Sequence, residues 1–101
     1  MQILLIYAAN VKEEIVMKSF DYIIKDEAGI HARPAGLLVK LAKQYSSKAV
    51  LKFNGKEVKL SGVMGLIGLG VKQGSEVVVE VEGEDEEAAA SAIQKFLEEN
   101  L

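Results

Sequence analysis

Apolar and polar side chains alternate in two separate stretches of the chain, residues 20–24 and residues 76–82. Alternation with a period of two is typical of a β-strand that buries one of its faces. In the second stretch the odd-numbered valines would point inward and Glu80 and Glu82 outward, although Val78 interrupts the pattern. The pattern therefore predicts two strands that lie far apart in the sequence.

Two further strands are expected on either side of Asn54-Gly55. Apolar-rich runs at residues 49–53 and 56–60 flank this dipeptide. Asn-Gly is a strong hairpin signal, because both residues tolerate the positive φ angles that a two-residue turn requires. The two runs should therefore pair as an antiparallel hairpin.

Three other segments carry apolar residues at helical spacing. The first helix is expected from about Ala32 to about Gln44. A short second helix is expected from Gly62 to about Gly68, with Ser61 as its N-cap. A third helix should follow Asp85, which is a good N-cap, and should bury the stripe Ala89, Ala92, Ile93, Phe96 and Leu97.

These elements follow in the order strand, helix, strand, strand, helix, strand, helix. With all helices on one face, this order predicts an α+β open-faced sandwich of a four-stranded antiparallel sheet and three helices. The pattern closes over residues 17–101, and residues 1–16 form an accessory or artefactual extension. Because residues 3–6 are apolar, we expect the extension to dock on an edge strand or to pair with a second copy.

Composition limits the possible classes of function. A chain of 101 residues, 50% of them hydrophobic, makes one small domain with a real core. With no cysteine and a single histidine, it has no thiol chemistry, and neither a metal centre nor a cofactor is expected. The net charge of −3 argues against a nucleic-acid surface. No apolar run approaches the ~18 residues of a membrane span, so we expect a cytoplasmic protein that is not inserted in a membrane.

Candidate chemistry gathers in residues 29–36, GIHARPAG, between the first strand and the first helix. Gly29 permits a tight reversal, His31 falls at the mouth of the helix, and Pro34 lies where a missing amide costs nothing. The free amides and the dipole of a helix start favour an anion. Arg33 adds a planar cation suited to phosphate oxygens, and a neutral imidazole is a nucleophile. Together they describe a histidine that carries a phosphoryl group.

Simpler interpretations of the same residues remain open. A lone histidine such as His31 is often only a surface or capping residue. Arg33 could serve only to pair with Asp26 or Glu27. Because proline pushes the preceding residue out of the α region, Arg33 could also precede the first regular turn.

The short second helix and the polar face of the first offer a second candidate surface. Met64 and Ile67, three residues apart, either form an exposed apolar patch for a partner or belong to the core with Val63, Leu66 and Leu69. Lys40 and Lys43 are either merely solvated or part of a docking surface for an acidic partner.

Residues 29–35, reading GIHARPA, resemble the active-site signature of the HPr family of the bacterial sugar phosphotransferase system. The resemblance runs from about Lys18 to Leu101 and includes the hairpin at residues 54–56 and the segment 63–65. The motif is specific, since a histidine, an arginine two residues later and an adjoining proline stand between the first strand and the first helix.

The resemblance implies a phosphoryl relay protein rather than an enzyme, which acts only together with Enzyme I and sugar-specific IIA proteins or domains. It implies that Enzyme I phosphorylates Nδ1 of His31 and that Arg33 steadies the phosphate. Ala32 would lend a backbone amide and Pro34 would start the helix. The surface for partners is implied at Gly36, Lys40, Lys43, Val63, Met64 and Ile67.

Three features depart from the family pattern. Ala28 stands where many relatives carry serine, threonine or asparagine. Gly62 stands where Gram-positive relatives carry a regulatory serine, so we expect no efficient phosphorylation by the HPr serine kinase, with Ser61 as the open alternative. Residues 1–16 precede the usual family start.

Two rival functions remain open. One is a regulatory binding module without phosphoryl flux, and the other is a relay that serves regulation rather than sugar uptake. The sequence leaves open which sugars or IIA partners are served.

Overall fold

Seven elements make up the fold of residues 17–101, the part of the chain that the computed structural model describes. In chain order they are β2 (Lys18–Ile23), α1 (Ala32–Ala42), β3 (Lys48–Phe53), β4 (Lys56–Lys59), α2 (Val63–Gly68), β5 (Glu76–Glu82) and α3 (Glu86–Asn100). Their types and order are those that the sequence predicts. The expectations for residues 1–16 lie outside the described residues.

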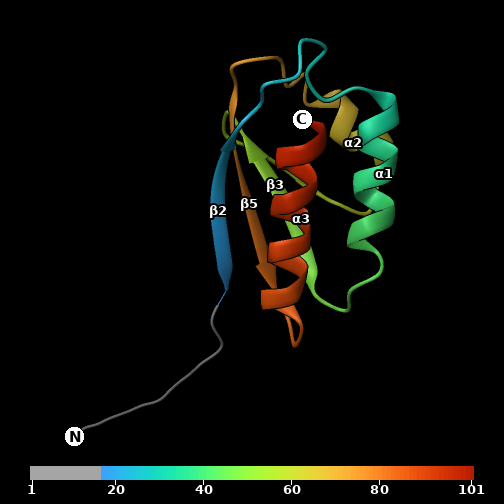
Figure 1. Cartoon of the computed structure of the whole chain (residues 1–101), viewed down its shortest axis with the longest axis vertical. Coiled ribbons are helices and arrows are strands. Elements are labelled where there is room, and N and C mark those ends of the chain that lie inside the picture. The colour runs from blue at the N-terminus through green and yellow to red at the C-terminus, as the bar shows by residue number, and fades with distance from the viewer. Residues whose placement is uncertain (1–16) are drawn as a thin grey trace, which may run out of the picture.

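The four strands form one antiparallel sheet in the order β2-β5-β3-β4. β5, the last strand in the sequence, therefore lies in the interior of the sheet between β2 and β3. The three helices cover one face of the sheet and leave the other face open (Figure 1). The predicted open-faced α+β sandwich is confirmed.

The register of the strands separates a buried face from a charged one. Val79 of β5 stands between Phe20 of β2 and Leu51 of β3. Val79 and Leu51 are fully buried on the face that the helices cover. On the opposite face the Lys52 ammonium forms an ion pair with the Glu80 carboxylate at 3.0 Å. The alternation seen in the sequence is thus the alternation between core and solvent.

The core lies between the sheet and the helices, and both contribute buried side chains to it. Its largest fully buried side chains are Ile24, Leu38, Leu51, Leu66, Ile93, Leu97, Val77, Val79 and Val81. Complete burial of one such side chain is worth roughly 1.5–3 kcal/mol relative to its exposure. The start of α1, where the candidate chemistry lies, therefore rests on a rigid scaffold.

The first helix is shorter than predicted, since α1 ends at Ala42 and the pattern extends to about Gln44. The Gln44 amide donates to the carbonyl of Leu41, three residues back, which closes a tighter turn at the helix end. The first strand begins and ends earlier than predicted, at residues 18–23 instead of 20–24.

Two predicted helix caps are replaced by other contacts. Ser61 is not the N-cap of α2: that position belongs to Gly62, and no side chain bonds the free amides there, because the helix starts one residue later than the pattern indicates. Asp85 does occupy the N-cap position of α3. Its carboxylate, however, accepts from the amides of Ser46 and Ser47, each at 2.9 Å. This contact ties the chain after α1 to the start of α3.

Candidate functional site at the start of α1

The loop that leads into α1 is fixed by backbone hydrogen bonds. The Gly29 amide donates to the Asp26 carbonyl at 2.9 Å, which closes a tight turn over residues 26–29. The Ile30 amide donates to the Val71 carbonyl at 3.1 Å, so the loop is attached to the segment that precedes β5. Ile30 is also buried. The residue that follows, His31, is therefore held at one place above the core.

His31 is the N-cap residue of α1, with an extended backbone at φ −113° and ψ −178°. Its carbonyl accepts from the Ala35 amide at 3.0 Å, the first bond of the helix. Its imidazole makes no capping hydrogen bond, and 45% of the side chain is exposed. The capping alternative for this side chain is thus wrong, and the ring is available to a partner.

Ala32, Arg33 and Pro34 form the first turn of the helix. The alternative in which Arg33 precedes the regular turn is therefore wrong. Proline fits here because an amide at this position would have no helical partner, and the Pro34 ring is buried. Arg33 is exposed and forms no ion pair with Asp26 or Glu27. Arg33 thus stands in the first helical turn, two residues after His31, with its side chain exposed.

Asp26 contacts His31 rather than Arg33. Its Oδ1 atom lies 3.9 Å from Nε2 of the His31 ring. The same Oδ1 accepts from the Ala28 amide at 2.8 Å. Sequence reasoning missed this contact, because four residues of loop separate Asp26 from His31 and no periodic pattern fixes their approach.

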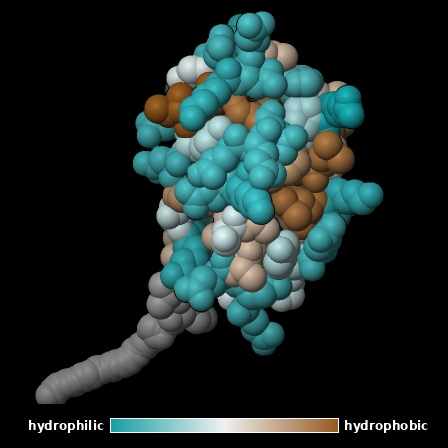
Figure 2. Space-filling model, in the orientation of Figure 1, coloured by the Kyte–Doolittle hydropathy of each residue, from teal (hydrophilic) through white to brown (hydrophobic). Residues whose placement is uncertain are grey.

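Of the residues proposed for an exposed apolar patch on α2, Met64 alone is largely exposed. Met64 is 78% exposed, whereas Leu66 is fully buried and Val63 and Ile67 are half-buried. A further exposed apolar residue, which no sequence pattern indicated, is Leu37 of α1, at 47%. Apolar atoms reach the surface on the side where α1 lies (Figure 2).

The other proposed partner residues lie along α1. Lys40 and Lys43 are exposed, and Gly36 is half-buried. A Cβ atom added to Gly36 would meet no heavy atom within 4 Å, so this side of the helix has open space above the backbone. A partner surface is therefore able to approach the helix closely at this residue.

Residues 17–101 contain no helix that is long and apolar enough to cross a membrane. In the same range, no group of three or more histidine, cysteine, aspartate or glutamate side chains is placed to hold a metal ion.

Comparison with known proteins connects this geometry to a family. A family model described as "PTS HPr component phosphorylation site" matches residues 18–99. The solved structure of HPr-C-His from Thermoanaerobacter tengcongensis is 40% identical, with a TM-score of 0.76, over 80% of this chain and 91% of that one. A phosphocarrier protein HPr from Bacillus anthracis is 28% identical, with a TM-score of 0.75, over 80% and 96%. Crh, the catabolite repression HPr of Bacillus subtilis, is 32% identical, with a TM-score of 0.65, over 85% and 100%.

Proposed function

This chain belongs to the HPr family of the phosphotransferase system, and we propose that it accepts a phosphoryl group on His31 from phosphorylated Enzyme I and passes it to sugar-specific IIA proteins or domains. The observation that carries the proposal is the exposed ring of His31 at the start of α1, which does not serve as a cap. Members of the family are carriers rather than catalysts. The partners therefore supply the catalysis, and this chain supplies the acceptor.

The residues around His31 suit a transient phosphohistidine. In the proposed step the Nδ1 lone pair attacks phosphorus, the bond from phosphorus to the donor breaks, and its electron pair returns to the donor. The phosphoryl oxygens then lie beside the Ala32 amide, which has no helical partner, and at the positive end of the helix dipole. The Arg33 guanidinium adds a permanent charge with a planar array of donors. These hydrogen bonds and charges orient the phosphoryl group, and its one covalent bond to the protein is the bond to His31.

The surface of α1 and α2 beside this site is the proposed docking area for Enzyme I and the IIA proteins. Its apolar part is supported by the exposure of Met64 and Leu37. Lys40 and Lys43 supply exposed cations for an acidic partner. We place the relay in the cytoplasm, in keeping with the family, with no cofactor and no nucleic-acid partner.

The test is incubation of the purified chain with Enzyme I and phosphoenolpyruvate carrying labelled phosphate. We expect acid-labile, base-stable label on the wild-type chain and none on His31→Ala. Because His31 is exposed, the variant should keep the circular dichroism spectrum of the wild type. Lys56→Ala, at the exposed first residue of β4, is the labelling control. Undiminished labelling of His31→Ala, or no labelling of the wild type as a regulatory module would give, contradicts the proposal.

A further inference from the structure

Asp26 is fixed in place beside the His31 ring. Its amide donates to a backbone oxygen of Leu101 at 2.8 Å, and its carbonyl accepts from the Gly29 amide at 2.9 Å. Its carboxylate accepts from the Ala28 amide through Oδ1 at 2.8 Å. Three hydrogen bonds thus hold this residue, including one to the far end of the described chain. A carboxylate held in this way keeps its orientation when a neighbouring side chain moves.

The ring that faces this carboxylate is free to approach it. Nε2 of His31 lies 3.9 Å from Oδ1 of Asp26, which is an ion-pair distance rather than a hydrogen bond. The His31 side chain is 45% exposed and makes no capping bond, so no capping interaction opposes a rotation of the ring toward the carboxylate. Within residues 17–101, no other carboxylate lies within ion-pair distance of the ring. The next acidic residue, Glu27, is exposed.

We propose that Asp26 is a positioning residue for the relay: its carboxylate holds the proton on Nε2 of His31 and thereby leaves the lone pair of Nδ1 for phosphorus. A neutral imidazole carries one proton, and the hydrogen bond made by one nitrogen decides which nitrogen is the acceptor. This inference rests on the proposed function, because the step that it serves is the attack by Nδ1.

The charge of Asp26 matters most after that attack. When Nδ1 of the neutral ring bonds to phosphorus, Nε2 keeps its proton and the ring becomes cationic. The Asp26 carboxylate then faces a positive partner. When the phosphoryl group moves on, the electron pair of the Nδ1–phosphorus bond returns to Nδ1, and the proton is still on Nε2. The cycle therefore needs no proton acceptor. Asp26 stabilises the cationic ring that His31 carries while it is phosphorylated.

Among the residues near His31 in the sequence, Asp26 is the one suited to hold the proton on Nε2. Ala28, in the loop between Asp26 and His31, offers no polar side chain, and its amide is used to orient the Asp26 carboxylate. Arg33, on the other side of His31, is a cation and cannot accept the Nε2 proton.

The first test requires no partner protein. Long-range ¹H–¹⁵N spectra of the full chain, at a pH where the ring is neutral, report which nitrogen of His31 carries the proton. Asp26→Asn keeps an oxygen to accept from the Ala28 amide but removes the charge. Glu27→Gln, which removes the same charge one residue away, is the matched control. We expect the fraction with the proton on Nε2 to fall in Asp26→Asn and to stay at the wild-type value in Glu27→Gln.

The second test measures the rate at which Enzyme I and phosphoenolpyruvate charge the same three proteins. We expect Asp26→Asn to be charged about two- to fivefold more slowly, the range given by the loss of an exposed ion pair, and Glu27→Gln to match the wild type. Identical spectra, or identical charging rates, for the wild type and Asp26→Asn would overturn the inference. If the wild type is not charged at all, the proposed function fails, whereas the spectra still decide whether Asp26 positions the ring.

Discussion

Gly29 lies so close to Val71 that a Cβ atom on Gly29 would stand 2.2 Å from the Val71 carbonyl oxygen. Gly29 also has a φ angle of +69°, in the left-handed region that other residues avoid. Both constraints arise where the loop that carries His31 meets the segment before β5. The position of the His31 ring thus depends on a glycine two residues before it.

Gly29→Ala should therefore destabilise the protein by at least about 1–2 kcal/mol, since the change adds both backbone strain and a clash. Gly36→Ala is the matched control, because Gly36 is helical and has no heavy atom within 4 Å of an added Cβ. We expect that change to stabilise α1 by up to about 1 kcal/mol. Urea unfolding measures both values. Equal stability of the two variants would show that the contact with Val71 constrains nothing.

Arg33→Lys should slow both charging and onward transfer by roughly tenfold while the fold is retained. Lysine keeps the charge but loses the planar pair of donors, and one hydrogen bond to a charged group is worth about that factor. Single-turnover transfer with Enzyme I and with a IIA protein measures the rates. Unchanged rates in both directions would make Arg33 a merely solvated residue.

Met64→Asp should weaken the binding of Enzyme I about tenfold or more, because it places a charge in the proposed apolar contact. The variant should remain folded, since Met64 is 78% exposed. Titration calorimetry gives the affinity and circular dichroism the fold. The control is Leu66→Asp, which buries a charge in the core and should unfold the domain. Full affinity of a folded Met64→Asp protein would place Met64 outside the interface.

Asp85 should make the free energy of unfolding depend on pH in the acid range. The Ser47 hydroxyl, and after it the Ser46 amide, hold the pKa of the Asp85 carboxyl below its ordinary value of 3.8. A folded-state pKa that is lowered contributes stability above the unfolded value, and this contribution is lost as the pH falls through the folded value. The stability difference between wild type and Asp85→Asn should therefore be full near neutral pH and shrink in acid. Urea unfolding of both proteins, from neutral pH into the acid range, measures this stability difference.

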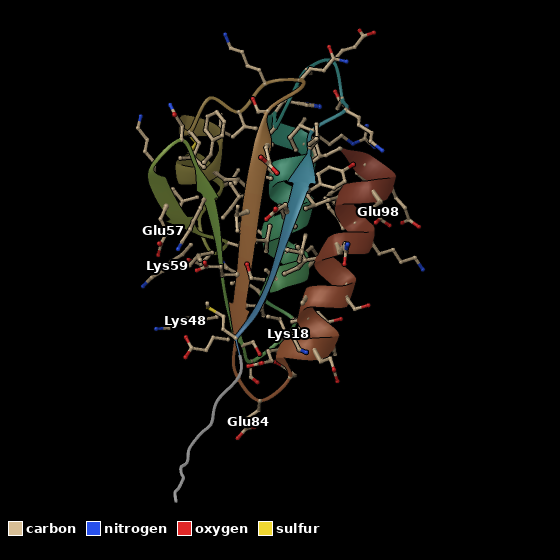
Figure 3. The ribbon with its side chains drawn as sticks, turned by 90° about the vertical axis from the view of Figure 1, so that its left-hand side faces the viewer. Lys18, Lys48, Glu57, Lys59, Glu84 and Glu98 are labelled. Carbon is tan, nitrogen blue, oxygen red and sulfur yellow. The ribbon has the colours of Figure 1, made fainter. Side chains whose placement is uncertain are left out.

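The control for that series is Glu84→Gln. Glu84 is exposed and points away from the fold at the turn before α3 (Figure 3). Its replacement should leave the acid profile of stability unchanged. A profile of Asp85→Asn that runs parallel to that of the wild type at every pH would contradict the role of the carboxylate.

A chain that starts at Met17 should fold and accept phosphate. The first strand, β2, begins at Lys18, so that every described element remains whole without residues 1–16. Labelling with Enzyme I, together with thermal unfolding, compares the short and the full chain. Failure of the short chain to fold or to be charged would make the extension part of the domain.

The sequence by itself determined the elements of this protein and the place of His31 at the start of a helix. Strand alternation, the Asn54-Gly55 turn and the helical stripes depend on residues that are close together in the chain. So does the position of His31 at a helix start, with Arg33 two residues later. Local periodicity and turn chemistry therefore sufficed for the fold class and for the centre of the candidate site.

Only the tertiary structure decided the contacts that join distant or irregular segments. The Asp85 carboxylate accepts a hydrogen bond from Ser47, 38 residues away, rather than capping its own helix. Gly62 rather than Ser61 is the N-cap of α2. The exposure of Met64 beside the buried Leu66 depends on how α2 lies on the rest of the fold. The approach of Asp26 to His31 depends on a loop fixed by Val71 and Leu101. No local pattern encodes these contacts, because their geometry is set by packing between elements rather than by spacing along the chain.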